Sequence, residues 1–206
     1  IQCCLVGSEM CIRDRGDMDL RNVVVAISGA SGSIYGIRVL QMLRQVEDVN
    51  SHLVITPSAK STIGVETEYS VSEIEELADE VHSARDIGAS IASGSFKTVG
   101  MIVAPCSIKT LSAIANSFGA DLVSRAADVT LKERRPLVLM VRETPFHLGH
   151  LRLMTKATEI GAVIYPPIPA FYNNPDNLED VIDHSAGRAL DHLGIEVAAL
   201  KRWEGR

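Results

Sequence analysis

The sequence is poor in aromatic residues and has no long apolar run, and each shortage excludes a class of protein. Aromatic residues make up only 4% of the 206 residues whereas hydrophobic residues make up 46%, a balance typical of an α/β interior of Val, Ile, Leu and Ala rather than of a disordered chain. No apolar run reaches the roughly 18 to 20 residues that a membrane-spanning helix needs. No signal peptide or lipidation motif is recognisable. We therefore expect a cytoplasmic protein without a membrane span.

Positive charge and cysteine are also scarce. Twenty Lys and Arg residues against 26 Asp and Glu residues give a formal net charge of −6. This balance argues against binding nucleic acid or an anionic membrane through the field of the whole surface. Of the four cysteines, Cys3, Cys4 and Cys11 lie near the start of the chain. Because no nearby His or fourth Cys completes a zinc ligand set, we predict no metal site there.

The chain divides into a short leader and one domain. Residues 1–17 show no hydrophobic period, helix cap or turn signal, and Met18 stands just before the first convincing strand. We interpret residues 1–17 as a leader that is non-native or disordered. Residues 18–206 have the length of a single compact domain, and no internal repeat or low-complexity linker divides them.

Within the domain, short β-branched apolar runs alternate with longer amphipathic stretches, which is typical of βα units around a parallel sheet. We predict five core strands, at residues 23–27, 52–56, 100–104, 137–141 and 162–165. We predict helices at residues 34–45, 107–115, 122–134, 150–160 and 178–193, with shorter ones after Thr56 and after the capping-box residue Ser70. The expected fold is α/β and single-domain, with a doubly wound, mostly parallel sheet in a Rossmann-like or flavodoxin-like three-layer sandwich. Such folds bind ligands at the carboxyl ends of their strands.

The loop after the first predicted strand, residues 28–32, consists of small residues and runs straight into a helix. Its backbone N–H groups and hydroxyls could approach a phosphate at the helix N-terminus, and a tight turn without a ligand is the alternative. Glycines at 29, 32 and 36 match neither the G-x-G-x-x-G dinucleotide motif nor the P-loop. A nucleophile elbow at Ser31 would need glycine two residues later, in the motif G-x-S-x-G. Ser33 stands at that position, which argues against a hydrolase.

A second hydroxyl-rich loop, residues 104–107, opens the helix after the third predicted strand. Two such loops at one edge of the sheet favour an extended polar ligand. Cys106 lies in this loop, but no triad spacing supports a nucleophile, and we interpret it as a small packed residue. Thr56 and Pro57 stand where an NAD enzyme would place its ribose-binding acid, which argues against that class.

Charged residues cluster further along the chain. Arg142 and Glu143 follow the fourth predicted strand and are expected at the ligand-binding edge. Arg125 and Lys132 are seven residues apart and so share one helix face. The run that continues through Arg135 is interpreted as a solvated helix end.

His147 and His150 lie in the loop and helix start beyond Arg142. They lack an evident third ligand, so we predict no metal site there.

Six motifs in this order resemble those of one family. They are residues 28–32 with Tyr35-Gly36, residues 92–95, residues 104–107, residues 125–136, residues 142–146 and Phe171-Tyr172. Over about residues 21–203 the chain resembles the flavin prenyltransferases, the UbiX-like family within the homo-oligomeric flavin-containing Cys decarboxylase superfamily. The family often has Ser where Thr56 stands.

The resemblance implies that reduced FMN accepts a dimethylallyl group from dimethylallyl monophosphate, first at N5 and then at C6. The product, prenylated FMN, would serve a UbiD-like decarboxylase in ubiquinone biosynthesis or aromatic-acid decarboxylation. A large homo-oligomer such as the family's dodecamer is expected, with sites at the subunit interfaces.

The resemblance also implies roles for individual residues. FMN would be held by Gly29, Ala30, Ser31, Thr56, Ser107, Thr110 and Arg125. The isoprenoid phosphate would be held by Lys132, Arg142, Tyr172 and Arg188, and a loop with Ser93 and Gly94 would reach a neighbouring subunit's site. Glu66 and Glu143 suit proton transfer, with Ser31 assisting. Fixed cations fit this chemistry, because ionising an allylic phosphate develops negative charge on the leaving group.

Two rival functions remain open. An FMN-dependent cysteinyl decarboxylase would need a catalytic His after the first flavin loop and a Pro-x-Met-Asn segment, and neither is present. A non-catalytic flavin-binding subunit of an aromatic-acid decarboxylase would not need the second set of cations, Lys132, Arg142 and Arg188.

Overall fold

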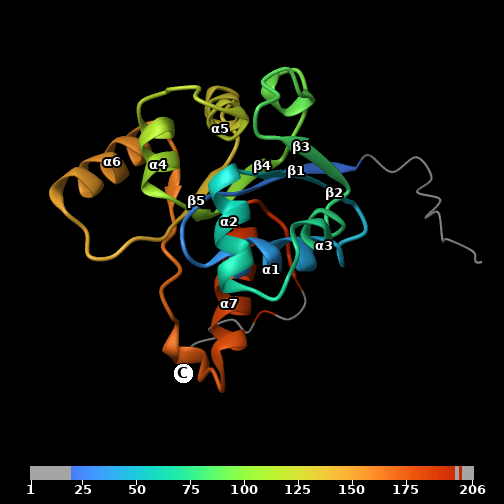
Figure 1. Ribbon diagram of the computed structural model, residues 1–206, viewed down its shortest axis with the longest axis vertical. Helices are drawn as coiled ribbons and strands as arrows, with labels where there is room; N and C mark the ends of the chain where they lie inside the picture. The colour runs from blue at the N-terminus through green and yellow to red at the C-terminus, as the bar shows by residue number, and fades with distance from the viewer. Residues whose placement is uncertain (1–19, 198–199, 201–206) are drawn as a thin grey trace, which may run out of the picture.

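The computed structural model describes residues 20–197 and residue 200, and a parallel sheet of six strands lies at its centre (Figure 1). The predicted leader, residues 1–17, lies outside the described residues. The strands run in the order β3-β2-β1-β4-β5-β6, and every neighbouring pair is parallel. Their bounds are β1 Arg21–Ile27, β2 Val49–Ile55, β3 Glu80–Ser83, β4 Gly100–Cys106, β5 Leu137–Val141 and β6 Val163–Ile164. This is the predicted doubly wound sheet. From β1 the chain adds β2 and β3 on one side and then β4, β5 and β6 on the other, so the strand order reverses between β1 and β4.

Helices cover both faces of the sheet. One layer holds α4 (Ile108–Ala115), α5 (Leu122–Lys132) and α6 (Leu148–Glu159), and the opposite layer holds α1 (Ser33–Leu43), α2 (Pro57–Glu66), α3 (Val71–Glu75) and α7 (Leu178–Asp191) (Figure 1). Two short 3-10 helices, η1 (Ser90–Ala92) and η2 (Phe171–Asn173), interrupt the connections. None of the described helices is both long and apolar enough to cross a bilayer.

The strands are apolar on both faces because each face is buried by one of these helix layers. In β1, Val23, Val25 and Ile27 pack towards α1 and α7, whereas Val24 and Ala26 pack towards α4, α5 and α6. All five side chains are at most 2% exposed. The continuous apolar runs therefore predicted buried parallel strands correctly.

The number of strands differs from the prediction, because the structure adds β3 at the edge of the sheet. Its four residues, Glu80 to Ser83, contain only one aliphatic side chain, and three of the four are exposed. An edge strand has solvent beside it, so it does not need the apolar run by which the other strands were recognised. Pairing with β2 over residues 52–55 defines it instead.

Helix starts follow local capping rules closely. The side chains of Thr56, Ser107 and Asp121 accept hydrogen bonds from the N–H groups of Ala59, Thr110 and Ser124. The Ser70 capping box is present as predicted, with Glu73 as its second member. These caps fix where α2, α4 and α5 begin, and all three begin at the carboxyl edge of the sheet.

Candidate active site

The carboxyl ends of β1, β2, β4 and β5 lie side by side, and the loops that follow them form the candidate site. Ser28 ties two of these loops together. Its buried hydroxyl donates to the Pro105 carbonyl at 2.8 Å and accepts from the Ser107 N–H at 2.8 Å. This bridge spans 79 residues of chain and sets the spacing between the loop after β1 and the loop after β4.

Close approaches of backbone and side chain require two glycines here. A Cβ on Gly29 would lie 2.3 Å from the Ser58 hydroxyl, and a Cβ on Gly36 would lie 2.3 Å from the Ala104 carbonyl oxygen. Gly36 therefore lets α1 pack directly against β4. Gly29 lets the first loop lie against the start of α2.

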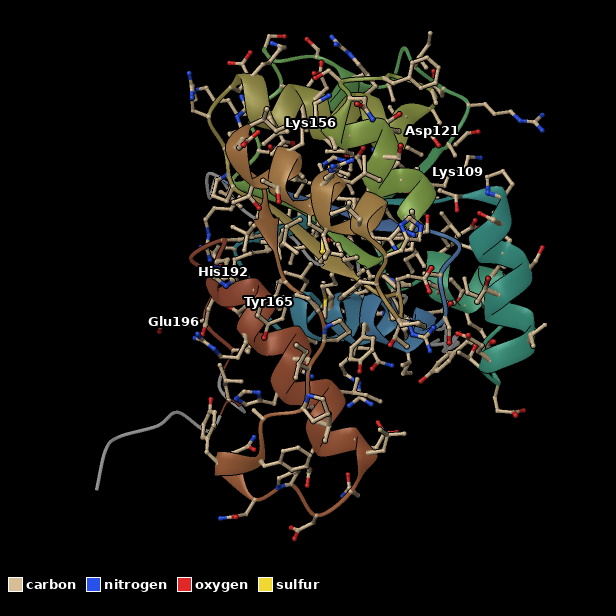
Figure 2. All side chains as sticks on the ribbon, turned by 90° about the vertical axis from the view of Figure 1, so that its left-hand side faces the viewer. Lys109, Asp121, Lys156, Tyr165, His192 and Glu196 are labelled. Atoms are coloured by element: carbon tan, nitrogen blue, oxygen red, sulfur yellow. The ribbon has the colours of Figure 1, made fainter. Side chains whose placement is uncertain are left out.

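A cavity of about 280 Å³ opens between the starts of α2, α4 and α5. Its lining is dominated by hydroxyls, with one carboxylate and one ammonium group: Thr56, Ser58, Ser107, Lys109, Thr110, Asp121 and Ser124, with Pro57, Ala113 and Ala120. Three helix N-termini direct their partial positive charge at this space, and such termini bind phosphate. Figure 2 shows Lys109 and Asp121 in the α4 layer, well apart from Tyr165 and His192 beside α7.

Glu66, at the end of α2, occupies the start of α1. Its Oε2 accepts the N–H groups of Gly32 at 2.8 Å and of Ser33 at 3.4 Å. The sequence favours a phosphate at this helix N-terminus, but Glu66 supplies the anion there. The three-helix cavity is therefore the candidate place for a phosphate.

Glu66 is an ionised carboxylate. Partial burial raises the pKa of Glu66, but hydrogen bonds from Ser31, Gly32 and Ser33 and the charge of Arg142 outweigh it, so its pKa lies below the usual range. Burial raises the pKa of Tyr35, and the charge of Arg142 partly opposes this rise. The structure thus brings Ser31, Glu66 and Arg142 together, although Ser31 and Arg142 are far apart in the sequence.

We call the carboxyl edge of the sheet around Ser31, Glu66 and Arg142 the rim. Arg142 and Glu143 extend this rim beyond β5. The Arg142 N–H donates to the Cys106 carbonyl at 3.1 Å, which holds the start of this segment against β4. The guanidinium is exposed, and Glu143 is half-buried. Glu143 accepts the N–H of Thr144 at 3.0 Å. Both lie at the predicted edge of the sheet.

The Ser93-Gly94 loop, which was expected to reach a neighbouring subunit's site, forms a second group with Arg125 and Lys132, near η1 and the end of α5. Arg125 donates to the Ala92 carbonyl and pairs with Asp128. Lys132 pairs with Glu133. A Cβ on Gly94 would lie 2.5 Å from Lys132 Nζ, so the Ser93-Gly94 loop lies directly against this lysine.

Arg135 corrects one prediction. It is not a solvated helix end, because its guanidinium donates to the carbonyls of Gly94 and Phe96 and to the Thr98 hydroxyl. These three acceptors belong to the 93–98 loop, which no local pattern around Arg135 could reveal. Arg135 therefore fixes the loop that carries Ser93 and Gly94.

A third group lies beside α7. Tyr172 Oη is 3.1 Å from His184 Nε2, and Arg188 pairs with Asp191 at 2.6 Å. Burial lowers the pKa of His184, and the charge of Arg188 acts in the same direction. His184 thus contacts Tyr172 and lies close enough to Arg188 for its charge to act, and both of these neighbours are predicted to hold the substrate phosphate.

One chain does not bring Lys132 and Arg142 together. Lys132 ends the helix that precedes β5, and Arg142 immediately follows the strand. A strand of this length spans roughly 16 Å, so the two cations lie towards opposite edges of the sheet. A site that uses both needs residues from more than one chain.

Two further residues show how the site is supported. Cys106 is fully buried, and burial raises the pKa of its thiol to about 12, so it is the packed residue that was predicted. His147 caps α6 by accepting the Gly149 N–H at Nδ1.

The sequence analysis did not name three residues that line the cavity: Ser58, Asp121 and Ser124. Asp121 and Ser124 have capping-box spacing, which is a signal that could have identified them.

Comparison with known proteins gives matches over most of the chain. The family model described as Flavoprotein matches residues 12–185. The flavin prenyltransferase UbiX of Escherichia coli strain K12 is 57% identical over 188 residues, which cover 90% of this chain and all of that protein. A crystal structure of AnUbiX (PadA1) with FMN and dimethylallyl pyrophosphate superposes with a TM-score of 0.88 at 50% identity, covering 91% of this chain and 99% of that one. A dodecameric FMN-dependent UbiX-like decarboxylase from Escherichia coli O157:H7 has a TM-score of 0.87 at 45% identity, covering 89% of this chain and all of that one.

Proposed function

This chain belongs to the Flavoprotein family and is a flavin prenyltransferase of the UbiX type, and from this premise we propose which of its residues bind and which react. The reaction transfers a dimethylallyl group from dimethylallyl monophosphate to N5 and then C6 of reduced FMN. The observation that supports this function best is the hydroxyl-lined cavity between three helix N-termini, on the same edge of the sheet as Glu66 and Arg142.

The residues around the cavity fit FMN. The FMN phosphate needs several hydrogen-bond donors. The hydroxyls of Thr56, Ser107 and Thr110 supply them in this cavity. Gly29 and Ala30 are proposed to contact FMN through their backbone. Gly29 also lets this loop lie against α2, since a Cβ there would meet Ser58. Ser31 extends the set towards Glu66, and Arg125 contributes from α5.

When bound, reduced FMN supplies the two nucleophilic atoms, N5 and C6, that take the prenyl group. Arg142 stabilises the negative charge that develops on the departing phosphate as the allylic C–O bond breaks. Glu66 is ionised and accepts hydrogen bonds from three donors, so it is suited to accept a proton released when the prenyl group bonds to the flavin. Ser31 donates to Glu66 and would pass this proton on. Glu143, at the same rim, is the second group proposed for proton transfer.

Part of the phosphate site comes from neighbouring chains in a homo-oligomer. Lys132 lies away from Arg142 in one chain, and Ser93 and Gly94 accompany Lys132. Tyr172 and Arg188, beside α7, are further proposed ligands of the phosphate. A dodecameric relative supports such sharing. In this arrangement each active site takes its flavin cradle from one chain and part of its phosphate site from others.

The product, prenylated FMN, is consumed by a UbiD-like decarboxylase of aromatic or related unsaturated acids. We also place the protein in the cytoplasm, where FMN and such a decarboxylase are present.

Anaerobic incubation with FMN, dithionite and dimethylallyl monophosphate, followed by mass spectrometry of the released flavin, tests this function. We expect a flavin heavier by one prenyl unit, and a parallel reaction with the diphosphate tests which leaving group is accepted. Unmodified FMN bound stoichiometrically by assembled protein would instead support a non-catalytic flavin-binding subunit. Turnover of cysteine-terminated peptides would support a decarboxylase.

A further inference from the structure

Three side chains with metal-binding groups meet on the outer strands β2 and β3, away from the strand ends that form the candidate site. His52 Nδ1 lies 3.0 Å from His82 Nε2. Glu80 Oε2 lies 3.5 Å from His52 Nδ1 and 4.0 Å from His82 Nε2. The register pairs His52 with Glu80, and Glu80 and His82 face the same side because they are two residues apart on a strand.

We propose that His52, Glu80 and His82 form a binding site for a borderline divalent transition metal, with Zn²⁺ as its representative. Two imidazole nitrogens and one carboxylate oxygen form a donor set that Zn²⁺ uses, with a fourth position left for water. Tetrahedral bonds of about 2.0 Å hold two nitrogens about 3.3 Å apart. The three ligand atoms already lie 3.0, 3.5 and 4.0 Å from one another, so changes of at most about 0.7 Å in these separations would complete the site.

The surroundings of His52 orient its ring for this role. His52 is fully buried, and its Nε2 lies 3.2 Å from Asn22 Oδ1. The Asn22 amide nitrogen donates to the Lys97 carbonyl at 2.9 Å, which assigns Oδ1 as an acceptor. The Asn50 amide nitrogen lies 3.1 Å from the same Nε2. The two amides hold the ring so that Nδ1 faces His82 and Glu80. A hydrogen bond at the other ring nitrogen is what orients metal-binding histidines.

Neutral imidazole is the form that coordinates a metal. The competing arrangement is a hydrogen bond between His82 Nε2 and His52 Nδ1, in stacked rings whose centroids are 5.3 Å apart.

The site has a route from solvent and a structural consequence. The Glu80 side chain is 54% exposed, and His82 also lines a hollow of about 420 Å³ at the edge of the sheet. The ring of Phe96 packs edge-on against His52, with centroids 5.1 Å apart. A bound metal would therefore join β2 to β3 directly beneath the 93–98 loop that Arg135 holds.

Zinc titration by calorimetry tests the proposal. The chain of residues 1–206 should carry Cys3→Ser, Cys4→Ser and Cys11→Ser, because cysteine thiolates would bind Zn²⁺ independently. We expect one Zn²⁺ per chain, loss of this binding in His82→Ala, and at least tenfold weaker binding in Glu80→Gln. The double variant His147→Ala/His150→Ala removes the other adjacent histidine pair, whose centroids are 3.6 Å apart, and should keep full binding.

Two further measurements keep the test decisive. Glu80 is exposed, so Glu80→Gln should fold even if His82→Ala does not, as circular dichroism will show. Zn²⁺ should slow hydrogen exchange at residues 80–83 and 96–98 in the parent chain but not in Glu80→Gln. Undiminished Zn²⁺ binding in folded Glu80→Gln, or loss of binding in the His147→Ala/His150→Ala variant, would overturn the proposal and leave His52 and His82 as a hydrogen-bonded structural pair.

Discussion

The rim around Glu66 and the groups around Lys132 and Arg188 hold their charged side chains in different ways. At the rim the partners are remote in sequence: Glu66 binds the Gly32 N–H across 34 residues, and Ser28 binds the Ser107 N–H across 79. In the other groups the charged partners are neighbours on one helix or its end, as in Lys132 with Glu133 and Arg188 with Asp191.

The rim is completed within one chain, whereas Lys132 is proposed to serve a neighbouring chain's site. The Lys132–Glu133 ion pair is exposed, and exposed pairs contribute only about 0 to 1 kcal/mol, so an incoming phosphate can replace Glu133 at little cost. The hydrogen bonds at the rim join different elements of the fold, and removing one leaves a polar group without its partner. The rim should therefore tolerate change poorly, whereas the distal groups should affect activity without affecting folding.

The largest effect is expected from Arg142→Ala. Losing the cation that faces the leaving phosphate should cost about 2 to 4 kcal/mol in the transition state, or roughly 30- to 1000-fold in turnover. FMN binding should persist, since the cavity residues remain, and flavin fluorescence titration will report it. Arg152→Ala, which removes an exposed arginine from α6, is the control and should retain turnover. Normal turnover of Arg142→Ala at saturating FMN would remove Arg142 from the mechanism.

Mixed oligomers test whether Lys132 and Arg142 act from different chains. Lys132→Ala and Arg142→Ala protein, unfolded and reassembled together in equal amounts, should regain roughly a quarter of the wild-type sites if one chain supplies each residue. Glu66→Gln mixed with Arg142→Ala is the matched control, because these two residues lie together in one chain and no mixed site is intact. Equal recovery in both mixtures would contradict a shared site.

Two glycine substitutions compare the regions by stability. A Cβ at Gly36 would meet the Ala104 backbone oxygen and Ile27, so Gly36→Ala should lower the free energy of unfolding by about 1 to 3 kcal/mol. A Cβ at Gly94 would meet only the ends of the Lys132 and Glu133 side chains, which can move aside. Gly94→Ala should therefore leave urea denaturation nearly unchanged while lowering activity. Equal destabilisation by both would remove the distinction between the regions.

The smallest expected effect is the pH dependence of Glu66. The pKa of Glu66 is lowered in the folded protein, so its ionised form contributes stability above its unfolded pKa and loses that contribution as pH falls through the folded pKa. Glu66→Gln should thus be less stable than wild type at neutral pH, and the difference should shrink below about pH 4. Thermal unfolding across this range measures it, with Glu68→Gln as a control for loss of the same charge nearby. A difference independent of pH would show that Glu66 acts through packing alone.

Patterns within a few residues predicted much of this fold. Apolar runs identified β1, β4 and β5, and hydroxyl caps at Thr56 and Ser107 identified helix starts at the carboxyl edge. The prediction missed β3 because an edge strand with polar residues carries no apolar run. It also misread Arg135, whose partners lie about 40 residues away on a loop.

The candidate site was predictable as a set of residues but not as an arrangement. The family resemblance named Glu66, Lys132 and Arg142, yet nothing in the sequence showed that Glu66 would occupy the start of α1. Nor did spacing bring His52 and His82 together, since they are 30 residues apart on strands whose pairing had not been recognised.

The sequence by itself determined the buried strands, the helix caps and the family, because each depends on the character of neighbouring residues or on motifs read in order. Only the tertiary structure decided which polar groups meet. Strand order and register place Ser28 beside Ser107, Glu66 beside Gly32 and His52 beside His82, and these positions follow from packing two helix layers on one sheet. Local patterns act over one or two turns of chain, whereas these contacts span 30 to 79 residues, so burial of the whole core is what brings them together.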